Sequence, residues 1–259
     1  APYVLGGVLL WFVIAYFANT SIINSATGSQ PMSRKENKRV YNLVENLCMS
    51  QGMKMPKINI IYDDSLNAYA SGINESTYTV TLSKGIIDKL EDAELEAVIA
   101  HELSHIRNHD VRLLIISIVF VGIFSMIAQI ALRSAYYSSF TRSNKNDKNG
   151  GAVVIILLAM LVAAIGYFFA TLMRFAISRK REYLADAGSA EMTKNPLALA
   201  NALRKISADP DIEAVKREDV AQLFIQHPGK QASSALSGLS GLFATHPPIE
   251  KRIQVLEQF

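Results

Sequence analysis

The chain has 259 residues, of which 50% are hydrophobic, and its 26 basic and 23 acidic residues leave a formal net charge of +3. This small charge is spread along the chain, and no basic block is interleaved with aromatic residues, which argues against a nucleic-acid-binding protein. Cys48 is the only cysteine, which excludes an internal disulfide and fits a reducing compartment.

Three long segments of the chain carry no charged residue. The first is apolar from about Tyr3 to Ile23, the second lies between Arg112 and Arg133, and the third runs from Ala152 to Met173. Each reaches the about 20 apolar residues that a helix needs to cross the hydrocarbon layer of a bilayer. A buried core helix of this length normally keeps a polar face. The sequence therefore predicts three transmembrane helices.

The regions between these segments carry the patterns of a mixed α+β domain. Apolar residues recur at helical spacing within 33–53, which predicts an amphipathic helix. The β-rich runs 57–62, 67–71 and 77–82 are separated by turn residues and predict two or three short strands in antiparallel pairing. Further helices are predicted over residues 91–110, 178–195, 197–206 and from about Pro248 onward, whereas residues 208–245 show little periodicity. The helix 91–110 begins with acidic residues, which suit a helix N-terminus, and it carries an apolar stripe at positions 95, 98, 99, 103 and 106.

The letters HELSH at residues 101–105 lie inside the predicted helix 91–110. On an α-helix, residues i and i+4 share one face, so His101 and His105 can offer two imidazole nitrogens to one ion. Glu102 is rotated by about 100° from His101 and reaches the adjacent flank, where a carboxylate can take a proton from an attacking water. This spacing is typical of zinc peptidases, but a helix with two exposed histidines produces the same five letters.

A catalytic zinc has three protein ligands and one open position. The longer motif with a third histidine needs Gly at position 108 and His at position 111, where this sequence has Asn108 and Val111. His109 lies eight residues from His101, which is roughly 12 Å along a helix axis and too far for both to bind one ion. We therefore expect His109 to be solvated or to lie behind a ligand.

Two downstream carboxylates, Glu182 and Asp186, are four residues apart and share a helix face. One could bind the ion while the other orients a ligand histidine through its second nitrogen. The alternative is a solvated charged face that balances the basic residues 179–181. Two predicted spans separate helix 91–110 from Glu182, and two crossings return a chain to the side it left, so topology favours the shared metal site.

The motifs AVIAHELSHIRNHD, REYLADAGSA and ATHPPIEKRI, preceded by NAYASG and TVTLSKGIID, resemble the HtpX-type integral-membrane zinc metallopeptidases, which are relatives of the CAAX prenyl endopeptidases. The resemblance covers about residues 32–259. It implies one zinc ion per chain and a hydrolytic mechanism that uses this ion. The site residues that it implies are the zinc ligands His101, His105 and Glu182, the general base Glu102, the orienting partner Asp186, and His246 and Arg252 as groups that face the substrate. The oxyanion needs positive charge beyond the zinc, and either His246 or Arg252 could supply it. His227, which also precedes a proline, is a rival for the role of His246.

The predicted fold is α+β and mostly helical, with a zincin-like metallopeptidase domain split by a transmembrane helical hairpin and preceded by one further transmembrane helix. The first helix is expected over residues 1–24. The first half of the domain, with a short sheet and the HELSH helix, covers 25–110, and the second half, with the third zinc ligand, covers 175–259. The hairpin between them covers 111–174 and includes a polar loop at 133–151. Members of the resembled family usually have an additional span before the first one seen here, so we expect the chain to begin late.

The expected activity is zinc-dependent endopeptidase cleavage of misfolded or damaged proteins, including membrane proteins, as in a protein quality control or stress response. The expected partners are unfolded or membrane protein substrates and the lipid bilayer, with a homo-oligomer left open. Basic residues near the span ends are more numerous on the catalytic side than in loop 133–151, which predicts a cytoplasmic active site in a bacterial inner membrane. The run 67–71 is expected to present an edge strand to an extended substrate.

Two alternative functions stay open from the sequence. A prenyl-peptide protease of the CAAX type would carry more spans than the three predicted here. A non-catalytic membrane scaffold with a structural metal would need a closed shell of four ligands, often cysteines, and Cys48 is far from HELSH in the sequence.

Overall fold

The computed structural model describes residues 27–110, 180–208 and 247–259, together with residues 10, 13, 14, 17, 20, 21, 23–25, 112, 160, 161 and 164–168. The chain divides into two compact units, one made of Ala1–Tyr16 and Ile116–Arg174, the other of Phe17–Ile115 and Phe175–Phe259. Most of the three predicted spans and all of the loop 133–151 lie outside the described residues. Among the residues described, no helix has the length and apolar character needed to span a bilayer.

A four-stranded sheet forms one part of the second unit, with the strand order β1-β2-β4-β3. The strands are β1 (Gln30–Pro31), β2 (Lys57–Ile61), β3 (Ala68–Ser71) and β4 (Thr79–Ser83). β4 pairs antiparallel with β3, as predicted, but it pairs parallel with β2, so the prediction of purely antiparallel pairing was wrong. The physical reason is the chain path: β3 runs back along the far side of β4, and β4 therefore runs in the same direction as β2.

The HELSH motif lies on α4 (Asp92–Arg107), a helix with well-defined ends. Glu91 and Glu94 form a capping box at its N-terminus, in which the Glu91 backbone N–H donates to Glu94 Oε2 at 2.9 Å. These bonds satisfy N–H groups that have no partner within the helix. The predicted apolar stripe of α4 is buried, and so are Ala97, Ala100 and Ser104 on its other sides. α4 is therefore a central helix, packed on several faces.

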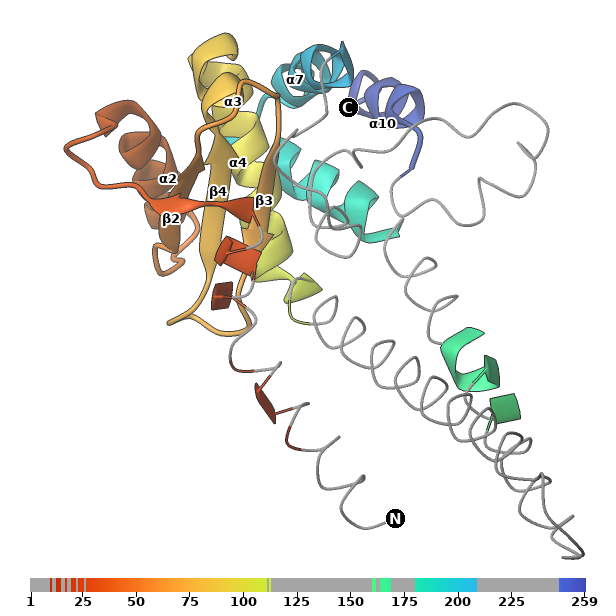
Figure 1. Ribbon diagram of the computed structural model, residues 1–259. Helices are drawn as coiled ribbons and strands as arrows, with labels where there is room; N and C mark the ends of the chain where they lie inside the picture. Colours follow the sequence, from red (N-terminus) through yellow and green to blue (C-terminus); the bar gives the residue numbers. More distant parts are fainter. Residues whose placement is uncertain are drawn as a thin grey trace, which may run out of the picture. The chain divides into compact units, whose positions relative to one another are not determined.

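This unit has five further helical segments among its described residues from Lys38 onward. They are α2 (Lys38–Ser50), α3 (Lys84–Lys89), a helical run over residues 180–193, α7 (Pro196–Ala208) and α10 (Ile249–Leu256). α2 contacts α4, α4 packs on β3 and on α7, and α7 in turn packs on α10 (Figure 1). The predicted helices within 33–53, 91–110, 197–206 and after Pro248 are present, and the described part of the predicted helix 178–195 is helical over residues 180–193. The short α3 was not predicted.

One close contact sets the distance between α4 and the helical run 180–193. A Cβ atom added at Gly188 would lie 2.3 Å from Ser104 Oγ, which is closer than side chains can approach. The neighbouring Ser189 Oγ donates to the carbonyl of Ala97 at 2.6 Å. Because Gly188 has no side chain, the two helices approach closely here. This approach brings Glu182 to the histidine face of α4.

Candidate metal centre

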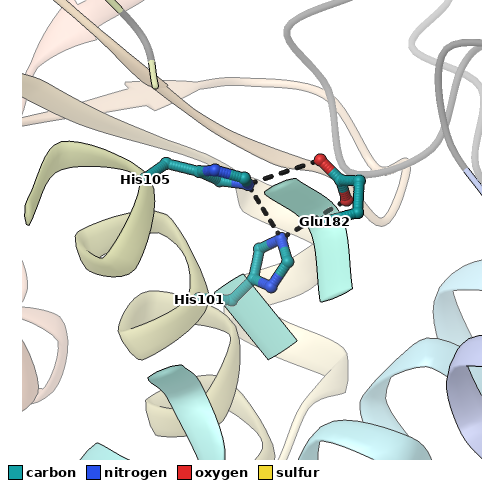
Figure 2. Close-up of side chains that lie close together, drawn as sticks. All are labelled: His101, His105 and Glu182. Carbon is teal, nitrogen blue, oxygen red and sulfur yellow. Dashed lines mark hydrogen bonds and ion pairs between the residues drawn. The ribbon is translucent and has the colours of Figure 1, made fainter. Parts of the chain in front are cut away.

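Donor atoms of three residues, from two helices, converge on one point. The Nε2 atoms of His101 and His105 lie 3.2 Å apart, and Glu182 places Oε2 at 3.7 Å from the first and Oε1 at 3.4 Å from the second. Figure 2 shows both imidazole rings and the carboxylate turned toward a common centre. Within the described part of the chain, these residues form a group able to hold a metal ion, with donor atoms all within 4.8 Å of one another.

The carboxylates behind the two rings indicate which nitrogen carries the proton. His101 Nδ1 lies 3.1 Å from Asp186 Oδ1, and His105 Nδ1 lies 3.1 Å from Asp110 Oδ2. A carboxylate accepts and does not donate when ionised, so each neutral ring carries its proton on Nδ1. The two Nε2 lone pairs then face each other and the carboxylate of Glu182. A proton or a metal cation between these atoms relieves the repulsion among the lone pairs.

The dimensions of the group fit zinc. Zinc binds His nitrogen and carboxylate oxygen at about 2.0–2.2 Å in tetrahedral geometry, and two corners of such a tetrahedron are about 3.4 Å apart. The two separations from His105 Nε2, 3.2 Å to His101 Nε2 and 3.4 Å to Glu182 Oε1, lie near this value, and the second carboxylate oxygen, Oε2, lies 3.7 Å from His101 Nε2. Three protein ligands also leave the fourth corner for water or substrate, as a catalytic rather than a structural zinc site requires.

The charge balance of the site also favours a cation. Burial lowers the pKa of His105, but the carboxylates of Asp110 and Glu182 outweigh it and raise this pKa to about 10. Without a metal ion, these carboxylates therefore keep the imidazole ring of His105 protonated and positively charged. A divalent ion would supply that charge directly.

Glu102 lies on the flank of α4, as the helical rotation predicted. It is buried, and burial raises the pKa of its carboxyl to about 7. The Ala70 backbone N–H, from β3, donates a hydrogen bond to this carboxylate. Glu102 is thus held by a backbone donor from the sheet, and the charges of His105 and Glu182 act on its carboxyl.

Arg252 lies behind the metal group and is fully buried on α10. Its Nε and Nη2 atoms donate to Asp186 at 2.9 and 2.6 Å, and Nη1 lies 3.3 Å from Glu182 Oε2. Although burial opposes ionisation, Arg252 lowers the pKa of Asp186 to about 2. The guanidinium therefore contacts two carboxylates: that of Asp186, which lies behind His101, and that of Glu182, which belongs to the metal group.

The remaining predicted residues are placed as follows. His109 is exposed and its Nδ1 lies 3.1 Å from the Tyr78 hydroxyl, so it is not a member of the metal group. His246 and His227 lie outside the described residues. Sequence reasoning missed Asp110, although a carboxylate five residues after a ligand histidine, at the end of the same helix, was the available signal.

Two histidines one helical turn apart, a carboxylate from a second helix and an adjacent buried glutamate fit the metal site of a zinc-dependent peptidase. The comparisons with known proteins agree, because the model of peptidase family M48 matches residues 34–259. The chain belongs to this family, and it is a zinc metalloendopeptidase. The resemblance inferred from the motifs is confirmed.

Individual relatives support the same assignment. The chain is 85% identical over 258 residues to the protease HtpX homolog of Bacteroides fragilis, covering 100% of this chain and 80% of that protein. It is 39% identical to the protease HtpX homolog of Dictyoglomus thermophilum, covering 96% and 81%. A crystal structure of S. mikatae Ste24p matches with a TM-score of 0.59 at 20% identity, covering 98% of this chain and 58% of that one. This last match shows a shared mixed helix-and-sheet fold.

Proposed function

We propose that this zinc endopeptidase is anchored in a membrane and cleaves extended segments of misfolded or damaged proteins. The observation that carries the proposal is the group of His101, His105 and Glu182 beside Glu102, with an outer strand of the sheet next to that base. The finer parts of the proposal are the residue roles, the mode of substrate binding and the membrane topology.

The residue roles follow from the contacts. A zinc ion held by His101, His105 and Glu182 would polarise the scissile carbonyl and acidify the attacking water. Glu102 accepts the proton of that water and returns it to the leaving amine, while the Ala70 N–H keeps its carboxylate in place. His246 is proposed to stabilise the oxyanion.

For Arg252 we propose a positioning role instead of the oxyanion role expected from the motif. Its three guanidinium nitrogens are directed at Asp186 and Glu182, and the side chain has no exposed surface. A donor engaged in this way orients ligands and does not reach a substrate carbonyl.

Substrate binding is proposed to extend the sheet at β3. The backbone N–H of Ser83 donates to the carbonyl of Asn67 at 2.9 Å, so in the antiparallel register Ala68 and Ala70 direct their backbone groups away from β4. The two N–H groups bond to Asn67 Oδ1 and to Glu102, which leaves the two carbonyls directed at the outer edge. All four residues of β3 are buried, so this edge must become accessible when substrate binds.

This binding mode selects extended substrates. A peptide that adds to a sheet edge must itself be a strand, because its main chain makes the ladder hydrogen bonds. A folded protein offers few such segments, whereas a misfolded one offers many. We therefore propose unfolded or damaged proteins as the substrate class.

For the membrane we propose the topology predicted from the sequence. The three uncharged segments each match a bilayer-spanning length, and the basic residues are concentrated near the span ends on the peptidase side. The active site would then face the cytoplasm of a bacterial cell, with the hairpin 111–174 inserted between the two halves of the metal site.

The test uses the purified full-length chain with one model protein in a folded and an unfolded form. We expect cleavage of the unfolded form, loss of cleavage with a zinc chelator and recovery on addition of zinc. Equal cleavage of both forms would contradict the substrate class. Cleavage that persists in chelator, after metal analysis has verified removal of zinc, would contradict the role of the metal.

A further inference from the structure

Each of the two histidines has the same kind of support at Nδ1: a carboxylate contacts the ring, and an arginine contacts that carboxylate. For His101 the partners are Asp186 and Arg252. For His105 they are Asp110 and Arg181: His105 Nδ1 lies 3.1 Å from Asp110 Oδ2, and Arg181 Nη1 lies 3.0 Å from Asp110 Oδ1. The second set was not expected from the sequence.

The Asp110–Arg181 contact joins two distant parts of the chain at the metal site. Arg181 Nη1 also donates to the backbone carbonyl of Asp110, at 3.4 Å. Arg181 directly precedes Glu182, and Asp110 follows the last turn of α4, so the contact ties the start of the helical run 180–193 to the end of the histidine helix. His105 and Glu182 are thereby connected by a path that does not pass through a metal ion.

From this geometry we propose that Asp110 and Arg181 are a positioning pair for the zinc site. Asp110 holds the proton of His105 on Nδ1 and so keeps Nε2 directed at the metal position. Arg181 holds Asp110 in place and sets Glu182 opposite that nitrogen. The inference rests on the proposed ligand roles of His105 and Glu182, and it adds two residues that orient these ligands.

The side chains of the pair and of His105 are mostly buried, so water screens their interaction only weakly. The exposed fractions are 14% for His105, 11% for Asp110 and 20% for Arg181. Ion pairs on an open surface contribute little because water screens them, whereas partly buried pairs with hydrogen bonds contribute more. Partners that orient a ligand histidine typically change metal affinity by about 10- to 100-fold when they are removed.

The protein contains a matched control for simple tethering of the two helices. Arg107 Nη2 on α4 lies 3.0 Å from Glu191 Oε2 on the run 180–193. This ion pair joins the same two helices, but its side chains are more exposed and it has no contact with a ligand histidine. Glu191→Gln therefore removes the charge attraction from one contact between the helices without changing the environment of His105.

The experiment measures zinc affinity by competition with a chelator for the full-length wild-type chain and for Asp110→Ala, Arg181→Gln, the double variant and Glu191→Gln. We expect a loss of about 10- to 100-fold for Asp110→Ala and a smaller loss for Arg181→Gln. The double variant should bind zinc no more weakly than Asp110→Ala, because Arg181 acts through Asp110. Glu191→Gln should stay within about twofold of the wild type, as expected for an exposed pair.

Cobalt(II) substitution supplies a readout that a general loss of stability would not change. The visible absorption bands of bound cobalt report ligand geometry, so they should change in Asp110→Ala and stay the same in Glu191→Gln. If Asp110→Ala does not fold, Asp110→Asn replaces it; this variant keeps an oxygen acceptor but lacks the charge, so it should show a smaller affinity loss in the same direction.

Three results separate the possible failures. Wild-type zinc affinity and cobalt bands in both Asp110 variants would overturn the positioning pair while leaving the peptidase assignment intact. An equal loss in Glu191→Gln would show that any link between the helices suffices, which also overturns it. Full zinc binding in His105→Ala, measured in parallel, would instead contradict the proposed ligand set.

Discussion

Arg252 and Asp186 form a two-pronged ion pair in the interior of the protein, with Nε–Oδ2 and Nη2–Oδ1 distances of 2.9 and 2.6 Å. The arginine is fully buried on α10, and the aspartate is buried on the helical run that also carries Glu182. The same aspartate contacts His101 Nδ1 at 3.1 Å. The C-terminal helix therefore supports the metal site from behind, through Asp186.

The first prediction concerns Arg252. Arg252→Ala leaves Asp186 buried without its cation, and breaking a buried pair in this way costs about 3–5 kcal/mol of unfolding free energy. Arg252→Lys should rescue little, because an ammonium cannot make the paired contacts of a guanidinium. Denaturant unfolding and zinc affinity measure both effects, and the exposed neighbour Lys251→Gln is the control. Full stability in Arg252→Ala would contradict the positioning role.

The second prediction concerns Glu102. Glu102→Gln should keep the zinc stoichiometry of the wild type and lose nearly all peptidase activity, because the metal ligands remain and the proton acceptor is removed. Metal analysis and peptide cleavage on the same preparation check this. Turnover near that of the wild type would show that another group is the base, and loss of zinc would make Glu102 a ligand.

The third prediction separates the two carboxylates of the helical run 180–193. Glu182→Ala removes one of three proposed ligands, so zinc affinity and activity should both fall sharply. Asp186→Ala should lower zinc affinity more mildly, by about 10- to 100-fold, because Asp186 contacts His101 on Nδ1, away from the metal position. Glu191→Ala and Glu213→Ala should have almost no effect. Full zinc in Glu182→Ala with loss in either of these two would identify a different third ligand.

The fourth prediction concerns the helix contact at Gly188. Gly188→Ala places a methyl group 2.3 Å from Ser104 Oγ, and such overpacking costs about 1–3 kcal/mol. Because the shift would move Glu182 relative to α4, zinc affinity should fall together with the melting temperature. Ser104→Gly removes the opposing atoms, so the double variant should lose less than the two single losses added together. Strict additivity would show that this contact does not set the helix spacing.

The fifth prediction concerns topology. Residues 134 to 150 should be accessible to a protease or thiol probe from outside the cytoplasm, while tags introduced near residue 190 should be cytoplasmic. The reason is that two spans, between Arg112 and Arg133 and from Ala152 to Met173, would place this loop opposite the peptidase domain. Labelling of both positions from the same side would rule out the hairpin arrangement.

The local features of the site could be predicted from the sequence because helix geometry is local. The spacing of His101 and His105 places them on one face of any α-helix, and the same rule pairs Glu182 with Asp186. The capping glutamates and the apolar stripe of α4 follow from residues within a few turns of one another. No information about the path of the chain is needed for these predictions.

Tertiary structure decided the relations between distant segments. Spacing alone could not say which of Glu182 and Asp186 approaches Nε2 and which contacts Nδ1, because both lie on the same helix face. Nor could it pair β2 with β4, since strand order depends on where the chain turns between strands. The contacts of Arg252 with Asp186 and of Arg181 with Asp110 span 66 and 71 residues, and they form only when packing brings α10, the helical run 180–193 and α4 together. Ion pairs of this kind leave no periodic pattern in a sequence, because each depends on the spatial position of its partner.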